Sequence, residues 1–328
     1  MTTLASNQWT VALRRAAVRA AMAPSVHNTQ PWRMHIKDGR LDIFADRSRR
    51  LPVLDPTSRQ LLISCGCAVM NARVSLAADG RHTEVVRSHD PINEELLASI
   101  TLQAGPADLA LAALDPAVET RQTNRRQFSP EEVPAAVLEV LEAAAEAEHA
   151  TLFVVRDPDQ RDVVAALSQR ADDIENLNPA YRAELRAWTS DEPGRRDGVP
   201  PLAVPRVDGT AEDDVPIRDF DTRGKGALPA ATHSTRKQTL AVVCTAGDSP
   251  AEWLRAGEAL ERVLLEIARH GYAASPLTQV TEVPAARAQL RQELSMMGYP
   301  HVLLRIGRAP VTASSRRRRL VDLLVDET

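Results

Sequence analysis

The sequence predicts an α+β protein built from two related halves, each a small sheet surrounded by helices, joined in one chain as a pseudo-dimer. Three observations support this prediction. Helix and strand patterns recur in the same order, two helical segments share glycine and alanine positions, and each half has a polar or basic segment that the other lacks. At 328 residues the chain also exceeds the usual size of one core.

The composition is that of a globular protein. Hydrophobic residues make up 44% and charged residues 26%, and the net charge is −4, so no basic surface favours nucleic acid. No apolar run is expected to span a bilayer, and the N-terminus lacks the pattern of a signal peptide. We therefore expect a cytoplasmic protein. Cys65, Cys67 and Cys244 suit buried positions and do not have the spacing of a zinc site.

The first half begins with a predicted helix over residues 7–22. Ser6 or Asn7 is suited to cap it, and Pro24 prevents its continuation. One face of this helix is apolar and contains Trp9, Leu13, Ala16, Ala17 and Ala20.

A hairpin and a second helix follow. The segments WRMHI and LDIFAD flank Asp38 and Gly39, which suit a two-residue turn. The apolar segment after Asp55 reads as a helix that ends at Gly80. HTEVVRS then predicts a strand, and residues 89–120 are predicted to be helical and then loosely connected. The first half is expected to cover residues 1–118.

The second half is expected over residues 119–328. Its first helix, within residues 128–157, is predicted to start with a capping box formed by Ser129 and Glu132, and to lead into the strand TLFVV. The remaining elements follow in order: a helix over about 158–187, a strand in KQTLAVVCT, an amphipathic helix over 251–271 capped by Gly271, and a strand over 301–307.

Residues 188–235 differ from the rest of this half. They contain six prolines and five glycines, many charges and little periodicity. A segment of this length inside a compact chain is typical of a lid, a binding loop or a disordered insertion, and the sequence leaves these three possibilities open.

The repeat is clearest in the two long helices. Gly66 and Gly257 lie 191 residues apart, and other pairs share this spacing: Ile63 with Leu254, Ala68 with Ala259, Ala77 with Ala268, and Gly80 with Gly271. Small residues inside a helix allow a neighbouring helix to approach closely. We interpret the pattern as two diverged copies of one unit.

The two copies differ in a complementary way. APSVHNTQPW (23–32) lies between helix and strand in the first copy, where the second has only EAEHATL. RQTNRRQF (121–128) precedes the second copy and has no counterpart before the first helix. One complete composite site per chain is therefore predicted.

These segments suggest different ligand contacts. Arginines with short polar neighbours suit a phosphate, although RQTNRR and the basic residues 316–319 also fit a solvated basic surface. In the opening loop, Ser25, Asn28 and Gln30 suit a planar ring rich in hydrogen-bonding groups, and equally a helix cap. His27 is expected to pack or orient the loop, and Trp32 to lie in the core. A Ser25 nucleophile with His27 as its base is not favoured, because no nucleophile elbow or third partner accompanies them.

With these residues the chain resembles the nitroreductase superfamily of flavin mononucleotide (FMN) proteins. The resemblance is carried by APSVHNTQPW, RQTNRR and the ending HVLLRIGRAP…RRRRLVDLL. It is closest to the Acg-type branch of actinobacteria, in which two nitroreductase-like halves are fused. The segments WTSDEPGRRDGVP and DSPAEWLRAGEALERVLLEIARHGYAASPLTQ also resemble that branch, so the likeness covers nearly the whole chain.

The resemblance implies a set of FMN-binding residues. The phosphate and ribityl groups would contact Arg121, Thr123, Asn124, Arg125, Arg317 and Arg319, and the flavin ring would contact Pro24, Ser25 and Asn28. Ser275, Pro276 and Leu277 would lie near the reactive edge of the ring. Two departures are present: Thr123 replaces the usual serine, and the usual Arg-Pro before the last apolar run is Arg-Leu or Arg-Arg.

The resemblance also implies a function. The implied protein is an FMN-dependent oxidoreductase that passes electrons from NAD(P)H to a nitroaromatic, a quinone or a similar planar acceptor. We expect it to be a monomer that forms its site alone, with neither nucleic acid nor a membrane as a partner. The flavin would carry the chemistry, so no catalytic side chain is named. The alternative is an FMN-storage protein in which a lid over 188–235, with Trp188 or Arg196, blocks turnover. A disordered segment would leave the site open.

Overall fold

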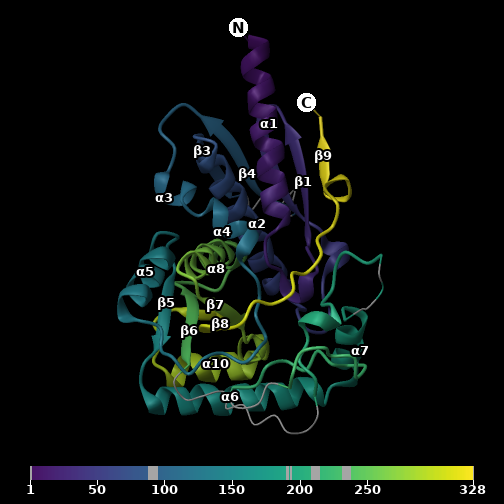
Figure 1. The fold of residues 1–328 in the computed structure, drawn as a ribbon, viewed down its shortest axis with the longest axis vertical. Coiled ribbons are helices and arrows are strands. Elements are labelled where there is room, and N and C mark those ends of the chain that lie inside the picture. Colours follow the sequence, from purple (N-terminus) through teal and green to yellow (C-terminus); the bar gives the residue numbers. More distant parts are fainter. Residues whose placement is uncertain are drawn as a thin grey trace.

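The computed structural model describes residues 2–87, 95–189, 192, 194–207, 215–230 and 238–327, with the side chains of 2–7 left out. Two β-sheets lie in the upper and lower parts of the molecule (Figure 1). Between them pack two long helices, α2 (Arg59–Ala78) and α8 (Pro250–Arg269). The predicted α+β architecture is confirmed.

The first sheet has the strand order β3-β4-β2-β1-β9, in which the first four strands pair antiparallel. The predicted hairpin is confirmed: Trp32 pairs with Ala45, and Asp38 and Gly39 have φ values of 51° and 73°. The elements of this region are α1 (Thr2–Ala21), η1 (Val26–Asn28), β1 (Trp32–Lys37), β2 (Arg40–Ala45), η2 (Arg47–Arg49), β3 (His82–Arg87) and β4 (Leu96–Gln103).

The second sheet repeats this plan. Its order is β7-β8-β6-β5, again antiparallel throughout, so each strand has a counterpart at the same place in the first sheet. The register shifts at Ile43/Phe44 in one sheet and at Val243/Cys244 in the other. The elements are α5 (Ala135–Glu146), β5 (Thr151–Val155), β6 (Thr239–Thr245), β7 (Ala273–Pro276) and β8 (Tyr299–Gly307). This recurrence supports two copies of one unit.

Helices α2 and α8 meet at the two glycines singled out in the sequence. A Cβ atom on Gly66 would lie less than 3.0 Å from the Leu254 carbonyl oxygen and 2.9 Å from Cα of Gly257. A Cβ atom on Gly257 would lie equally close to the Ile63 carbonyl oxygen. The contact is reciprocal, because Ile63 and Leu254 are themselves a pair in the repeat.

The halves differ most in how their first two strands are connected. A two-residue turn joins β1 to β2, whereas residues 156–238 join β5 to β6. The predicted insertion at 188–235 is thus the end of a longer one, which also contains α6 (Pro158–Asn176), α7 (Pro179–Ala187) and η3 (Pro201–Ala203). The single helix predicted over 158–187 is interrupted because the Asn178 side chain caps α7. Part of the predicted lid lies outside the described residues.

The prediction for residues 89–120 is wrong in part. Residues 96–103 form strand β4, in which Ala98, Ile100 and Leu102 alternate toward the core. Residues 88–94 lie outside the described part of the chain. Short helices α3 (Leu109–Ala112) and α4 (Asp115–Thr120) follow, and α9 (Gln279–Glu282) and α10 (Pro284–Glu293) separate β7 from β8.

Two predicted helix starts are also wrong. Helix α1 begins at Thr2, so Ser6 and Asn7 lie inside it and do not cap it. On its predicted apolar face four residues are buried, but Trp9 is 40% exposed. Helix α5 begins at Ala135 instead of Ser129. The reason is Pro134, which disfavours helical backbone at the residue before it.

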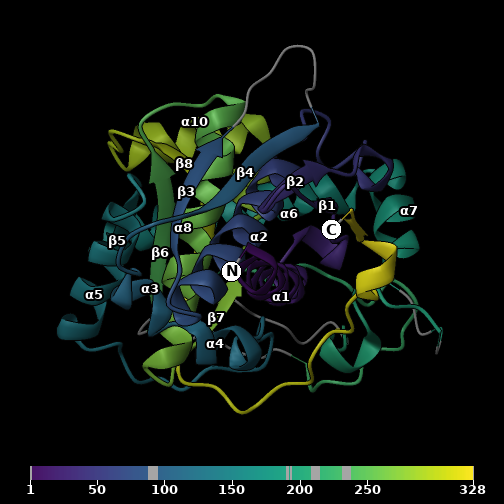
Figure 2. The same ribbon diagram turned by 90° about the horizontal axis from the view of Figure 1, so that it is seen from above.

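The C-terminal segment returns from the second sheet to the first. After β8 it runs past the opening loop, forms η4 (Leu320–Asp322), and adds β9 (Leu324–Asp326) parallel to β1, with Met34 opposite Leu324 (Figures 1 and 2). This path brings the basic residues 316–319 beside the loop at 23–32.

Helix α2 corrects one expectation about apolar segments. It is long and apolar enough to cross a membrane by length and composition, but 83% of its most apolar window is buried inside the protein. A core helix of a soluble protein has the same properties. Cys65, Cys67 and Cys244 are free and buried, as predicted.

Candidate functional site

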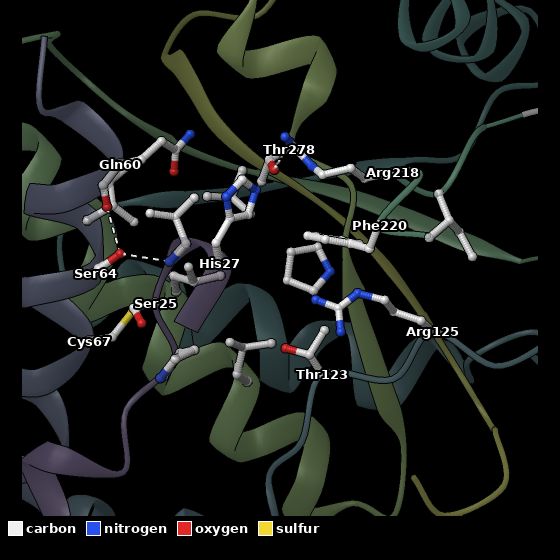
Figure 3. Close-up of a pocket in the computed structure, with 18 residues that line it drawn as sticks. Ser25, His27, Gln60, Ser64, Cys67, Thr123, Arg125, Arg218, Phe220 and Thr278 are labelled. Carbon is white, nitrogen blue, oxygen red and sulfur yellow. Dashed lines mark hydrogen bonds between the residues drawn. The ribbon is translucent and has the colours of Figure 1, made fainter. Parts of the chain in front are cut away.

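A cavity of about 100 Å³ lies between the halves (Figure 3). The opening loop, helix α2, the arginine segment, the insertion and β7 all contribute to its wall. The polar and aromatic side chains that line it are Ser25, His27, Gln60, Ser64, Cys67, Thr123, Arg125, Arg218, Phe220 and Thr278. The structure therefore brings together the two segments that the sequence predicted to be complementary.

The opening loop is held in an uncommon conformation. His27, Asn28 and Gln30 have φ values of 48°, 55° and 51°, a region that residues other than glycine seldom occupy. Two hydrogen bonds fix it: the Gln30 amide donates to Ser25 Oγ at 2.9 Å, and the Val26 amide donates to Ser64 Oγ at 3.1 Å. Backbone strain that is maintained by surrounding contacts is frequent at binding sites.

His27 is buried beside the cavity, with its ring edge-on to Phe220 at 5.4 Å. Neither ring nitrogen has a hydrogen-bond partner. Burial, and then the nearby charges of Arg218 and Arg125, hold the pKa of His27 well below its usual value, so the ring is neutral. A neutral imidazole with two free nitrogens can donate one hydrogen bond to a ligand and accept another. Trp32 is fully buried in the core, as expected.

The arginine segment lies as a short extended stretch beside β7. Thr123 bridges to Ala274, and the Asn124 amide donates to the Ala274 carbonyl at 2.9 Å. Thr123 and Arg125 line the cavity, whereas Arg121 and Asn124 line a separate cavity of about 230 Å³ beside α8 and residues 309–312. The Asn124 side chain instead donates to the Pro310 carbonyl at 2.8 Å and accepts from the Arg126 amide. Asn124 thus positions the segment.

Arg121 and Arg317 meet around the buried carboxylate of Glu261. Arg121 Nε lies 3.3 Å from Glu261 Oε1, and Arg317 donates to Asn28 Oδ1 at 2.9 Å and to the Met22 carbonyl at 3.2 Å. The Nε atoms of both arginines lack a hydrogen-bond partner. Burial raises the pKa of Glu261 to about 7, against the attraction of Arg121. The pair joins the arginine segment, the loop and the C-terminal segment.

Arg125 is the cation of the site with the fewest partners. It lies over the Phe220 ring at 4.6 Å and donates to the Ala203 carbonyl at 3.4 Å. Among the described residues no carboxylate pairs with it. Burial and the neighbouring Arg218 lower the pKa of Arg125 to about 10, which still leaves it charged. A half-buried guanidinium that no described carboxylate pairs with suits an anionic ligand.

The two lid residues named from the sequence do not line the cavity. Trp188 packs against an apolar cluster that includes Leu51 and Leu54, with Arg49 and Arg195 on its ring. The carbonyl of Arg196 accepts a hydrogen bond from Gln30 Nε2 at 2.9 Å. Phe220 and Arg218 of the same insertion line the cavity instead (Figure 3).

The insertion is fastened directly to the opening loop. Asn28 Nδ2 donates to the carbonyls of Gly198 and Arg316, both at 3.0 Å, and the Gly198 amide donates to the Asn28 carbonyl at 3.3 Å. Arg49 forms an ion pair with Asp197. All polar atoms of the Asn28 side chain are thus engaged within the protein, so Asn28 holds the loop and the insertion together.

The remaining predicted residues fall into different environments. Pro24 and Pro276 line the cavity, and Ser275 is buried beside them with no partner for its hydroxyl. Leu277 packs in the core of the second half. Arg319 lies on the surface, where it pairs with Asp322 at 3.0 Å, and we leave it out of the site.

Several lining residues were missed in the sequence. Gln60, Ser64 and Cys67 follow helical spacing and could have been identified as a polar stripe on an otherwise apolar helix. Thr278 follows directly after the predicted Ser-Pro-Leu. Arg218 and Phe220 carry no such signal, because they lie in an aperiodic segment.

Arg218 connects the insertion to three helices. Its guanidinium contacts Glu282, the Tyr181 hydroxyl, Thr278 Oγ1 at 3.2 Å and Glu175 at 3.5 Å. Burial raises the pKa of Glu175 to about 8 despite the attraction of Arg218. Two carboxylates share one guanidinium, so Glu175 keeps its proton at neutral pH.

The folded protein should therefore lose stability as the pH rises. The pKa of Glu175 increases on folding from 4.5 to about 8. Its contribution to the free energy of unfolding is therefore fully present below about pH 4.5 and lost above about pH 8. Glu175→Gln removes the titration, and its unfolding free energy, measured with urea, should fall less steeply across this range than that of the wild type. If the unfolding free energies of the wild type and Glu175→Gln changed in parallel with pH, the raised pKa of Glu175 would be contradicted. Glu131→Gln, on the surface, is the control.

Comparisons with known proteins give relatives over most of the chain. "Putative NAD(P)H nitroreductase Rv3131" of Mycobacterium tuberculosis H37Rv is 33% identical over 302 residues, which cover 92% of this chain and 86% of that protein. "Putative NAD(P)H nitroreductase acg" of the same strain is 31% identical over 303 residues, covering 91% and 89%. No family model matches the chain.

The solved structures that align with this chain are more distant. A nitroreductase with bound FMN from Desulfitobacterium hafniense aligns with a TM-score of 0.40 at 11% identity, over 63% of this chain and 94% of that one. A nitroreductase-like protein in complex with FMN from Desulfovibrio desulfuricans aligns with a TM-score of 0.39 at 16% identity, over 66% and 96%.

Proposed function

The chain belongs to the nitroreductase family that includes Acg, and on this basis we propose that it is a cytoplasmic FMN-dependent oxidoreductase. Electrons would pass from NAD(P)H to a planar acceptor such as a nitroaromatic or a quinone. The observation that carries the proposal is the composite cavity, in which the opening loop of one half faces the arginine segment of the other.

The polar groups in and beside the cavity fit FMN. Arg125 has no carboxylate partner among the described residues, and buried polar atoms of His27, Gln60 and Ser275 also lack partners. These groups match a ligand with an anionic tail and a ring rich in hydrogen-bonding atoms. The cavity of about 100 Å³ is smaller than the roughly 300–1,000 Å³ of common ligand pockets. Binding therefore requires the cavity to widen, and Phe220 and Arg125 are among the side chains that form its wall.

The residues of the site have separable roles. Arg125 and Thr123 would bind the phosphate and ribityl groups, with Arg121 and Arg317 supporting them. Pro24, Ser25 and His27 would face the ring. Asn28 and Asn124 use their side chains within the protein and act by positioning. When bound, FMN supplies the redox chemistry, while these residues bind it, orient it and exclude water.

The fold supports a site that is complete in one chain. We propose that residues 1–118 and 119–328 are two halves of a pseudo-dimer, with the C-terminal strand returned to the first sheet. Support comes from the equal strand order and from the reciprocal contact of Gly66 with Gly257. Since the loop and the arginine segment come from different halves, a monomer suffices.

FMN storage is a second candidate, favoured by the position of the insertion. Phe220 lies in the cavity wall, and Arg218 anchors it through buried ion pairs. The hydrogen bonds to Asn28 and Gln30 fasten the preceding part of the insertion over the loop. A side chain held in this way would keep a hydride donor away from the flavin.

Anaerobic mixing of the FMN-loaded protein with NADPH or NADH distinguishes the two roles. We expect the flavin absorbance to bleach, and Phe220→Ala to bleach faster because the ring no longer obstructs the cavity. Leu202→Ala, at an exposed position of the same insertion, should behave like the wild type. Absence of bleaching in the wild type would contradict the oxidoreductase, and bleaching only in Phe220→Ala would favour storage.

A further inference from the structure

Six arginines from three distant segments of the chain lie around the opening loop. Two follow β2, two belong to the insertion, and two belong to the C-terminal segment that returns to the first sheet. None of the six lines the cavity. The chain as a whole has a net charge of −4, so the positive charge here is a local feature. We call these six residues the basic surface: Arg49, Arg50, Arg195, Arg196, Arg316 and Arg318.

Two consecutive residues of the opening loop hold the three segments together. Arg49 Nε donates to the Thr29 carbonyl. Gln30, which is fully buried, donates from Nε2 to the Arg196 carbonyl at 2.9 Å and accepts at Oε1 from the Arg318 amide at 2.7 Å. The three segments therefore meet at the loop through bonds that involve the backbone, and the basic surface is fixed in place by the fold.

Two carboxylates neutralise part of the basic surface. Asp197 forms ion pairs with Arg49 and with Arg195, the latter at 2.5 Å, and Asp46 lies 3.6 Å from Arg318. Burial, and then the charge of Arg49, lowers the pKa of Arg318. Like charges therefore lie close enough to repel one another, and a bound anion would relieve this repulsion.

The other three members, Arg50, Arg196 and Arg316, are exposed to solvent. Arg50 and Arg196 pair with no carboxylate in the part of the chain that the structure describes. A guanidinium offers several donors in a planar fork that matches the oxygens of a phosphate. The basic surface is thus suited to a phosphorylated ligand.

The basic surface adjoins the cavity along the chain. Residues 24–27 of the opening loop line the cavity. Gln30, which holds two of the arginine segments, follows His27 by three residues, a reach of at most about 11 Å of extended chain. A ligand that places one end at the cavity and extends along the loop would bring its other end to the basic surface.

We propose that the basic surface binds phosphates of the electron donor, and that the protein therefore uses NADPH in preference to NADH. This inference rests on the proposed function. The two donors differ only in the 2′-phosphate of NADPH, which adds up to about two negative charges. Arginine is the residue that commonly accommodates this phosphate in proteins that bind NADP.

Titration calorimetry of the FMN-loaded protein tests the surface without turnover. The probes are adenosine 2′,5′-bisphosphate, which carries the 2′-phosphate, and 5′-AMP, which lacks it. We expect the bisphosphate to bind more tightly, and the double variant Arg50→Gln/Arg196→Gln to bind it about tenfold more weakly, as two exposed contacts would predict. Binding of 5′-AMP should change less than about threefold. Arg156→Gln, which removes an exposed arginine of the second half, should bind both probes as the wild type does.

Anaerobic reduction of the bound flavin tests the preference itself. At about 0.05 M salt, NADPH should bleach the flavin at least about tenfold faster than NADH at equal subsaturating concentration. The difference should shrink in the double variant, and also at about 0.5 M salt, where exposed charges are screened over a shorter distance.

The outcomes separate this inference from the proposed function. Equal rates with NADPH and NADH, a preference for NADPH that the double variant retains in full, or equal binding of the two probes by the wild type would overturn the inference alone. If neither donor reduced the flavin, the proposed oxidoreductase would be overturned and the inference with it.

Discussion

Replacing Gly66 with alanine should lower the free energy of unfolding by about 3 kcal/mol. The added methyl would lie closer than 3.0 Å to the Leu254 carbonyl oxygen, a distance that real Cβ atoms essentially never show. The three obstructing groups, this carbonyl, the Glu258 amide nitrogen and Cα of Gly257, are all backbone, so no side chain can rotate away. The better helix propensity of alanine, about 1 kcal/mol, does not offset the separation of two core helices.

The reciprocal contact provides internal controls for this prediction. Gly257→Ala should cost about as much as Gly66→Ala, whereas Gly194→Ala, where a Cβ atom meets nothing within 4 Å, should be nearly neutral. The double variant should lose less unfolding free energy than the sum of the two single losses, because helices that the first methyl has moved apart can accommodate the second. Urea unfolding followed by circular dichroism measures all four. A loss below about 1 kcal/mol in either single variant would show that the helices separate easily.

The close packing at Gly66 and Gly257 was predictable from the sequence because of its chemistry, whereas only the structure shows that α2 and α8 pack against each other there. Only a residue without a side chain allows two backbones to approach so closely, and its recurrence at equal places in the repeat indicates one packing geometry used twice. The same reasoning placed the opening loop opposite the arginine segment, since each lacked a counterpart in its own half. These inferences depended on residue type and spacing, which a sequence displays directly.

Other features depend on packing that the sequence does not display. The leucines, alanine and isoleucine of strand β4 suit a helix as well as a strand, so the sequence predicts a helix there, and the alternation becomes evident only beside β2 and β3. Phe220 and Arg218 are brought to the cavity by the ion pairs of Arg218 with Glu175 and Glu282, three segments far apart in the chain. No periodicity marks such a contact.

Arg125→Met should weaken FMN binding by roughly 10- to 150-fold, the equivalent of a charge-assisted hydrogen bond of about 1.5–3 kcal/mol. Methionine retains the apolar contact with Phe220 and removes the charge. The stability of the apoprotein should be almost unchanged, because Arg125 pairs with no carboxylate among the described residues. Quenching of flavin fluorescence measures the affinity, and Arg319→Met, which removes a surface arginine, should bind FMN as the wild type does.

Riboflavin shows which part of the ligand Arg125 contacts, since it differs from FMN only in lacking the phosphate. If Arg125 binds the phosphate, the substitution should weaken FMN binding and leave riboflavin binding almost unaffected. Equal losses for both would place Arg125 at the ring instead, and no loss for either would remove it from the site. Arg121→Met would not serve this purpose, because it leaves the buried Glu261 without its ion-pair partner and alters the fold at the same time.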